Sequence, residues 1–217
     1  MARTRILIAD DHELVVHAFK RLLTTAHDVV GTVTDGQALV KAAGELSPEV
    51  ILVDLTMPQL NGLDAIERIK AQQPRVRLIA LTQQEDHDTA AEAIRRGASG
   101  YVLKSSAPTE LFDAIEQVLQ GKVYVSPKIA SDPSAVFAAQ AIRSRRAAGL
   151  TLRQREVLQL LAEGKSMKEA ALVLNVTPRT IAFHKYSIMD RFGLKRTAEL
   201  VQLAVSLGLI TTGTRRV

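Results

Sequence analysis

Residues 1–122 alternate five times between a short apolar run and an amphipathic stretch, and no other feature restricts the fold as strongly. The apolar runs have the length of strands and end near Asp10, Thr34, Asp54, Thr82 and Lys104. Each run precedes a helical pattern, at residues 13–26, 36–46, 62–72, 86–96 and 108–120. Repeated strand–helix units with short connections predict an α/β domain with a five-stranded parallel sheet covered on both faces.

Polar side chains stand where four of these strands end: Asp10 with Asp11, then Asp54, Thr82 and Lys104. In an open α/β sheet the chemistry gathers at the carboxyl ends of the strands, so we expect these groups in one crevice. Three acids, a hydroxyl and an ammonium suit a divalent cation and a phosphoryl group. Asp54 is the candidate for covalent phosphorylation, since carboxylates can act as nucleophiles. Lys104 and Thr82 are expected to bind phosphoryl oxygens.

The acids also predict a magnesium site. Mg²⁺ prefers hard oxygen ligands in near-octahedral geometry. Asp11 and Asp54 are the expected direct ligands, with Asp10 binding directly or through water and the backbone carbonyl of Thr56 completing the protein's share. Taken singly, an aspartate at a strand end is more often a cap or turn residue. The combination of such residues at four strand ends is what indicates a site.

Charge divides the chain into an acidic half and a basic half. Residues 1–122 hold 13 Lys/Arg against 17 Asp/Glu, a net −4, and residues 123–217 hold 15 against 6, a net +9. A basic segment of this size is typical of nucleic-acid binding, with solubility as the plainer alternative.

Other features of the composition restrict the compartment and the class of protein. No apolar run approaches the ~18 residues of a membrane span, and no signal-peptide pattern precedes the first strand. With no cysteine there is no disulfide framework. A cytoplasmic protein with no membrane partner is expected.

The basic half is predicted to be helical after a linker. Residues 123–148 contain prolines and small residues and are expected to form a linker with a helix at 134–147. Capping boxes begin helices after Thr151 and Ser166, and Thr177 caps a third helix with Pro178 at its first position. The expected helices, including a fourth from about residue 197, end at Gly164, Leu174, Phe192 and Leu207. The second and third helices form a helix-turn-helix.

The third helix is the candidate DNA reader. In a helix-turn-helix this helix lies in the major groove. Its Ala182 and Phe183 are candidates for contact with thymine methyl groups, and Tyr186 for contact with a base edge or a phosphate. His184 falls near the core side and is interpreted as structural. The candidates for phosphate contacts are Lys165, Lys168, Thr177, Arg179, Thr180 and Lys185.

One set of motifs in the first half is specific in combination: Asp10-Asp11, Asp54, Met57-Pro58, Thr82 and Gly100-Tyr101-Val102-Leu103-Lys104. With these motifs, residues 4–122 closely resemble the receiver domain of two-component response regulators. The resemblance implies a flavodoxin-like fold and transfer of a phosphoryl group to Asp54 from a sensor histidine kinase or a small phosphodonor. It also implies that Thr82 and Tyr101 relay the change to the face formed by the fourth helix and fifth strand.

A second set carries a resemblance in the basic half: Arg155-Glu156-Val157-Leu158, Leu161-Ala162-Glu163-Gly164-Lys165-Ser166, Thr180-Ile181 and Glu199-Leu200-Val201. With it, residues 149–210 resemble the output domain of the NarL/FixJ, or LuxR-type, subfamily. The resemblance implies a four-helix domain, here 149–217, that binds double-stranded promoter DNA as a homodimer. The fourth helix would supply the interface, with Leu200, Val201, Ala204 and Val205 as candidates.

The two halves together predict a phosphorylation-controlled transcription regulator whose only chemistry is the gain and loss of a phosphoryl group at Asp54. Two alternatives fit some of the same residues. One is an Mg²⁺-dependent enzyme that turns over phosphate esters through an Asp54 adduct, although no separate substrate domain is visible. The other is a DNA-binding protein whose first domain is controlled by protein contacts alone, although the acid set is intact.

Overall fold

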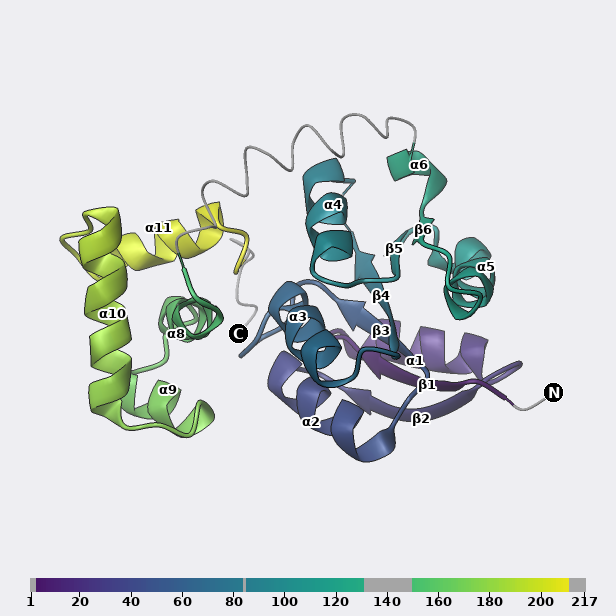
Figure 1. The fold of residues 1–217 in the computed structure, drawn as a ribbon, viewed down its shortest axis with the longest axis horizontal. Helices are drawn as coiled ribbons and strands as arrows, with labels where there is room; N and C mark the ends of the chain where they lie inside the picture. The colour runs from purple at the N-terminus through teal and green to yellow at the C-terminus, as the bar shows by residue number, and fades with distance from the viewer. Residues whose placement is uncertain (1–2, 84, 131–149, 211–217) are drawn as a thin grey trace. The chain divides into compact units, whose positions relative to one another are not determined.

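The computed structural model describes residues 3–83, 85–130 and 150–210, which form two compact units (Figure 1). The first unit holds the elements from β1 to α6, and the second holds α8 to α11. The helix expected at residues 134–147 lies outside the described residues. Within the described ranges, no helix combines the length and the apolar character that crossing a bilayer requires.

A fully parallel sheet forms the centre of the first unit, in the order β2-β1-β3-β4-β5-β6. The central strands β1, β3 and β4 are buried along almost their whole length because helices cover both faces. The strands are β1 (Arg5–Ala9), β2 (Asp28–Val33), β3 (Val50–Asp54), β4 (Arg77–Thr82), β5 (Gly100–Leu103) and β6 (Tyr124–Val125).

Over the residues that the structure describes, the sheet has six strands, one more than the five predicted, while the parallel α/β architecture is the predicted one. The additional strand, β6, lies in the range expected to be linker and pairs with β5, with Tyr124 opposite Gly100 and Val125 opposite Tyr101. Two residues are too few to show a strand period in the sequence. The strand forms because the edge of β5 offers unpaired backbone groups, which is a tertiary circumstance.

Helices cover the two faces of the sheet unequally. On one face, Phe19 and Leu23 of α1 and Leu111 and Ile115 of α5 are buried against alternate strand residues. Figure 1 shows α2, α3 and α4 on the opposite face. The helices are α1 (Glu13–Leu23), α2 (Gly36–Leu46), α3 (Gly62–Gln72), α4 (His87–Arg95), α5 (Ala107–Leu119) and the short α6 (Pro127–Ala130). The bounds of α2 and α3 are the predicted ones.

Over its described residues, 150–210, the second unit consists of four helices, and their starts match the predicted caps. Both capping boxes form, at Thr151 and at Ser166, and Thr177 accepts a hydrogen bond from the backbone of Thr180. Asn175, with φ of +51°, adopts the left-handed conformation between the second and third helices. The helices are α8 (Leu152–Ala162), α9 (Met167–Val173), α10 (Pro178–Phe192) and α11 (Ala198–Ser206).

Two small apolar clusters hold these four helices together. In one, Val157 of α8 and Ile181 of α10 pack with α9 residues. In the other, Leu158 of α8 and Ile188 of α10 pack with Leu200 of α11. Because Ile181 and Ile188 lie on one side of α10, the burial of that side fixes which side of the helix faces outward.

Candidate functional site

The carboxyl edge of the sheet brings three of the predicted residues, Asp10, Asp54 and Lys104, together. Asp10 directly follows β1, Asp54 is the last residue of the neighbouring β3, and both are almost fully buried. Lys104, which follows β5, places its Nζ 2.6 Å from Asp10 Oδ2 and 2.9 Å from Asp54 Oδ2. A buried ammonium therefore bridges two buried carboxylates that would otherwise repel one another.

Backbone amides fix the orientation of both buried acids. The N–H of His12 donates to Asp10 Oδ1 at 3.0 Å, and the N–H of Thr56 donates to Asp54 Oδ1 at 3.2 Å. The chain also returns close to the second acid, since a Cβ at position 62 would stand 2.2 Å from the carbonyl oxygen of Asp54. Gly62 is therefore required by this close approach, a role that its place at a helix start did not reveal.

Burial and charge set the protonation of the acid and its cation. Burial raises the pKa of Asp54 to about 6, and the nearby Lys104 ammonium only partly offsets that effect. Burial by itself would lower the pKa of Lys104, but the attraction of Asp54 and the hydrogen bonds to Asp10 and Asp54 raise it above its ordinary value. Near neutral pH, Asp54 is mostly ionised and Lys104 is charged, which is the state a carboxylate nucleophile requires.

Donor atoms of Asp10, Asp11, His12 and Asp54 lie within 4.8 Å of one another. The three carboxylates give the set the hard oxygen donors that suit Mg²⁺. The imidazole of His12, 2.7 Å from Asp11 Oδ1, was not among the predicted residues. Its position directly after the two acids was the only available signal.

Thr82 and Tyr101 lie on neighbouring strands of the first unit. Thr82 ends β4 and is almost fully buried, and its backbone carbonyl accepts a hydrogen bond from the N–H of Lys104 at 2.7 Å. Tyr101 of β5 is fully buried and pairs with Ala80 of β4. Tyr101 is therefore a buried aromatic residue of the sheet. Its proposed relay role rests on the resemblance.

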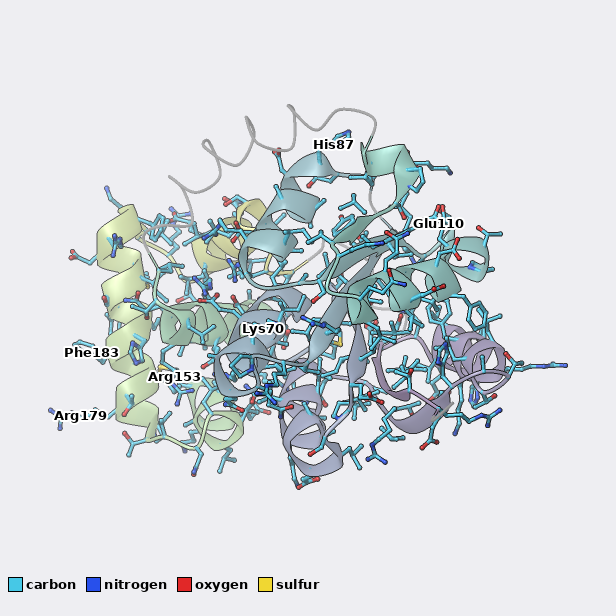
Figure 2. The ribbon with its side chains drawn as sticks, turned by 45° about the vertical axis from the view of Figure 1, so that its right-hand side comes forward. Lys70, His87, Glu110, Arg153, Arg179 and Phe183 are labelled. Carbon is cyan, nitrogen blue, oxygen red and sulfur yellow. The ribbon has the colours of Figure 1, made fainter. Side chains whose placement is uncertain are left out.

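In the second unit, the predicted DNA-contact residues of α10 lie mostly on its open side. Figure 2 shows Arg179 and Phe183 projecting away from the other helices of the unit. The side chains of Phe183 and Tyr186 are large and exposed, at 70% and 61%. Ala182 is half-buried beside them. Two neighbouring aromatic rings are rarely left exposed on a surface that binds nothing. Their exposure indicates that this side of α10 contacts a binding partner.

The other predicted DNA-contact residues have local partners as well. The hydroxyls of Thr177 and Thr180 lie 2.9 Å apart at the start of α10, where Thr177 is the cap. Lys185 donates to the hydroxyl of Thr197 at 3.0 Å and lies over the ring of Tyr186. Lys168 is exposed and Lys165 is half-buried.

His184 fits the structural interpretation. Burial and the charge of Arg153 lower its pKa, so its imidazole is neutral at pH 7 and offers no charge to a phosphate.

The candidates for a dimer interface on α11 separate into two kinds. Leu200 and Ala204 are buried in the core of their own unit, so their side chains are already occupied. Val201 is 40% exposed and Val205 is half-buried. The part of this set that remains open to a second copy is therefore Val201 with Val205.

Comparison with known families matches both units. The model of the response regulator receiver domain matches residues 6–116, and that of bacterial regulatory proteins, luxR family, matches residues 148–204. The first match covers the whole carboxyl-edge site. The second covers the helix-turn-helix and most of α11.

Individual relatives match over nearly the full length. The chain is 32% identical over 215 residues to the transcriptional regulatory protein MctR of Rhizobium johnstonii, covering 96% of each. It is 34% identical over 214 residues to the oxygen regulatory protein NreC of Staphylococcus aureus, covering 95% of this chain and 99% of NreC. Among solved structures, RcsB of Salmonella enterica serovar Typhimurium bound to a promoter has a TM-score of 0.60 and 28% identity, covering 94% of this chain and 99% of RcsB.

Proposed function

The chain belongs to the two-component response regulators of the NarL/FixJ, or LuxR-type, subfamily, as a phosphorylation-controlled transcription regulator, and we propose that Asp54 is its phosphoryl acceptor. The observation that carries this proposal is the buried ammonium of Lys104 between Asp10 and Asp54. A sensor histidine kinase is the expected donor. The family is one of transcription regulators, not of enzymes.

In the proposed reaction, one Asp54 oxygen attacks the phosphorus of a phosphohistidine. A new O–P bond forms, the P–N bond breaks, and the imidazole keeps the electron pair of that bond. Lys104, freed from the carboxylates, then pairs with a phosphoryl oxygen, and the Thr82 hydroxyl donates to another. Asp10, Asp11, Asp54 and the carbonyl of Thr56 would hold Mg²⁺, which supplies neutralising charge for the acids and the phosphoryl oxygens.

Intact mass after incubation with acetyl phosphate and Mg²⁺ tests the acceptor. We expect a single phosphoryl adduct that is absent in Asp54→Ala and present in Asp11→Ala only at a much reduced rate. Glu13→Ala, which removes an exposed acid close in sequence, is the matched control and should leave the adduct unchanged. Continuous release of phosphate at high turnover, without accumulation of the adduct, would support the phosphate-ester enzyme instead.

Phosphorylation is proposed to shift the population of this chain towards a dimeric form that binds promoter DNA, in the cytoplasm. Val201 and Val205 of α11 are the proposed dimer contacts. In the DNA complex α10 would lie in the major groove. The proposed phosphate contacts, which position the protein without specifying sequence, are Lys165, Lys168, Thr177, Arg179, Thr180 and Lys185.

Recognition of the DNA sequence by α10 is proposed to depend on an apolar contact with a base. Phe183 is exposed beside the small Ala182, and Tyr186 follows one turn later, so this part of α10 offers rings and a methyl group where many readers offer charged donors. Apolar side chains in the major groove recognise the methyl group of thymine. Bound sequences selected from a random library should therefore contain a thymine that is required for binding.

Replacing that thymine with uracil, which removes only the methyl group, tests the contact. We expect affinity to fall about fivefold for the wild type and to be unaffected in Phe183→Ala. Arg179→Ala is the matched control, since loss of a phosphate contact should weaken thymine and uracil sites equally. Equal sensitivity to uracil in the wild type and Phe183→Ala would contradict the assignment.

A further inference from the structure

Ser126 stands one residue beyond β6 and is bonded twice to β5. Its N–H donates to the carbonyl of Tyr101 at 2.9 Å, and its hydroxyl oxygen accepts the N–H of Leu103 at 3.1 Å. The residue is fully buried. A longer β6 would offer a carbonyl to Leu103, so the hydroxyl of Ser126 takes the place of that carbonyl at the end of a two-residue strand.

The same hydroxyl is fixed by α5. It donates to Glu110 Oε2, and the phenol of Tyr124 donates to the same oxygen at 3.3 Å. Figure 2 labels Glu110 on this helix. Burial and the charge of Glu110 raise the pKa of Tyr124 to about 12, so the phenol keeps its proton at neutral pH. One carboxylate therefore anchors both side chains that hold the end of β6.

This anchored end adjoins the phosphoryl site. Leu103 directly precedes Lys104, whose ammonium bridges Asp10 and Asp54. The backbone of Leu103 and Lys104 is hydrogen-bonded on both sides. The N–H of Lys104 donates to the backbone carbonyl of Thr82 in β4, and the N–H of Leu103 donates to the hydroxyl of Ser126. In the other direction along the chain, Ser126 leads into α6 and then through residues 131–149 towards the helical unit.

We propose that Ser126, held by Glu110, is a positioning residue for Lys104 that couples the state of Asp54 to the segment leading to the DNA-binding unit. When Lys104 leaves the two carboxylates for a phosphoryl oxygen, the backbone at Leu103 moves, and Ser126 moves with it. The proposal rests on the proposed acceptor role of Asp54. It extends the phosphoryl site beyond residue 116, where the match to the receiver family ends.

The test compares Ser126→Thr with Ser126→Val in the full chain. The two replacements have nearly the same shape and share any crowding at this buried position, but only threonine keeps the hydroxyl. We expect acetyl phosphate to load Asp54 about fivefold more slowly in Ser126→Val than in the wild type, the effect of one hydrogen bond. Ser126→Thr should stay within about twofold of the wild type.

A second readout follows the coupling itself. Beryllofluoride mimics the phosphoryl group. Its addition should change the amide hydrogen-exchange rates of residues 123–130 in the wild type and in Ser126→Thr, but not in Ser126→Val. Glu110→Gln should weaken the response, because it removes the charge that holds the hydroxyl. Thr109→Ala is the matched control on α5, since the exposed Thr109 hydroxyl bonds only back to Ser106 in the described contacts.

The outcomes separate this proposal from the acceptor role. Equal loading and equal exchange in the threonine and valine variants would overturn the proposal while leaving Asp54 as the acceptor. If the wild type forms no adduct, the acceptor role of Asp54 fails. The positioning role of Ser126 is then tested in the unphosphorylated wild type and variants. In that case, an amide resonance of Lys104 that shifts in Ser126→Val but not in Ser126→Thr supports the positioning role, and identical resonances overturn it.

Discussion

The phosphoryl site and the DNA-reading helix differ in how their side chains are held. Asp10, Asp54 and Lys104 lie at the ends of three strands, have almost fully buried side chains, and share one ion-pair network. Phe183 and Arg179 lie one turn apart on one helix and are exposed. The first site therefore depends on tertiary packing for its charge state, whereas the second depends on packing only for the direction in which its helix faces. A substitution should therefore affect stability strongly in the first region and binding selectively in the second.

The largest expected effect comes from removing the central cation. Lys104→Met leaves Asp10 and Asp54 buried without their counter-charge. We therefore expect the free energy of unfolding of the first unit, the receiver domain, to fall by about 4 kcal/mol at pH 7.5. The measurement is urea denaturation in EDTA. The loss should shrink at pH 5, because the pKa of Asp54 is raised to about 6 and a protonated Asp54 needs no counter-charge. A loss independent of pH would contradict this account.

A pair of substitutions on α10 tests whether only one side of that helix carries stability. Ile181→Ala removes a fully buried side chain and should lower the free energy of unfolding of the helical unit by about 3 kcal/mol. Phe183→Ala, two positions along, should change it by no more than about 0.5 kcal/mol. Thermal or urea unfolding followed by circular dichroism provides the measurement. Similar losses in both variants would mean that Phe183 is part of the core.

Asp54→Asn should stabilise the receiver unit while abolishing phosphorylation. Because the pKa of Asp54 is raised from 3.8 to about 6, the folded state holds the proton more tightly than the unfolded state does. That contribution is complete below about pH 4 and is lost as the pH rises through about 6. Asparagine cannot ionise, so the variant should gain on the order of 2 kcal/mol at pH 7.5 and almost nothing at pH 4. Denaturation curves without metal at both pH values check the sign, and an equal gain at pH 4 would exclude this cause.

The smallest effect on stability is expected at Arg179. Arg179→Ala should leave unfolding unchanged and reduce the slope of log affinity against log salt concentration by about 1, as expected for one lost phosphate contact. Fluorescence anisotropy with a labelled duplex at several salt concentrations measures the slope. An unchanged slope with a changed sequence preference would instead place Arg179 at a base edge.

Local patterns predicted the helices well. Capping residues and periodic apolar positions located the bounds of α2 and α3 and the caps at Thr151, Ser166 and Thr177. These signals lie within a few residues of the feature that they specify.

Predictions failed or stayed incomplete where a distant partner decides the structure. Strand β6 forms only because β5 offers an edge, and Ser126 carries no motif that announces its two bonds to that strand. Six of the nine residues of α11 are apolar, more than one buried face needs, so composition could not show that Leu200 and Ala204 face the core while Val201 remains exposed. His12 and Gly62 were missed for the same reason, since each acquires its importance from the folded neighbourhood of the acids.

Periodicity, capping and charge are local properties. They were enough to predict the alternation of strands and helices, the acids and the lysine that follow the strands, and the basic helix-turn-helix. Three features became visible only in the folded chain: Lys104 bridges Asp10 and Asp54, burial raises the pKa of Asp54, and Ser126 ties the end of β5 to the chain beyond it. The physical reason is that ion pairing, desolvation and strand-edge pairing act between residues far apart in sequence, and their strength depends on distances and burial that exist only after packing.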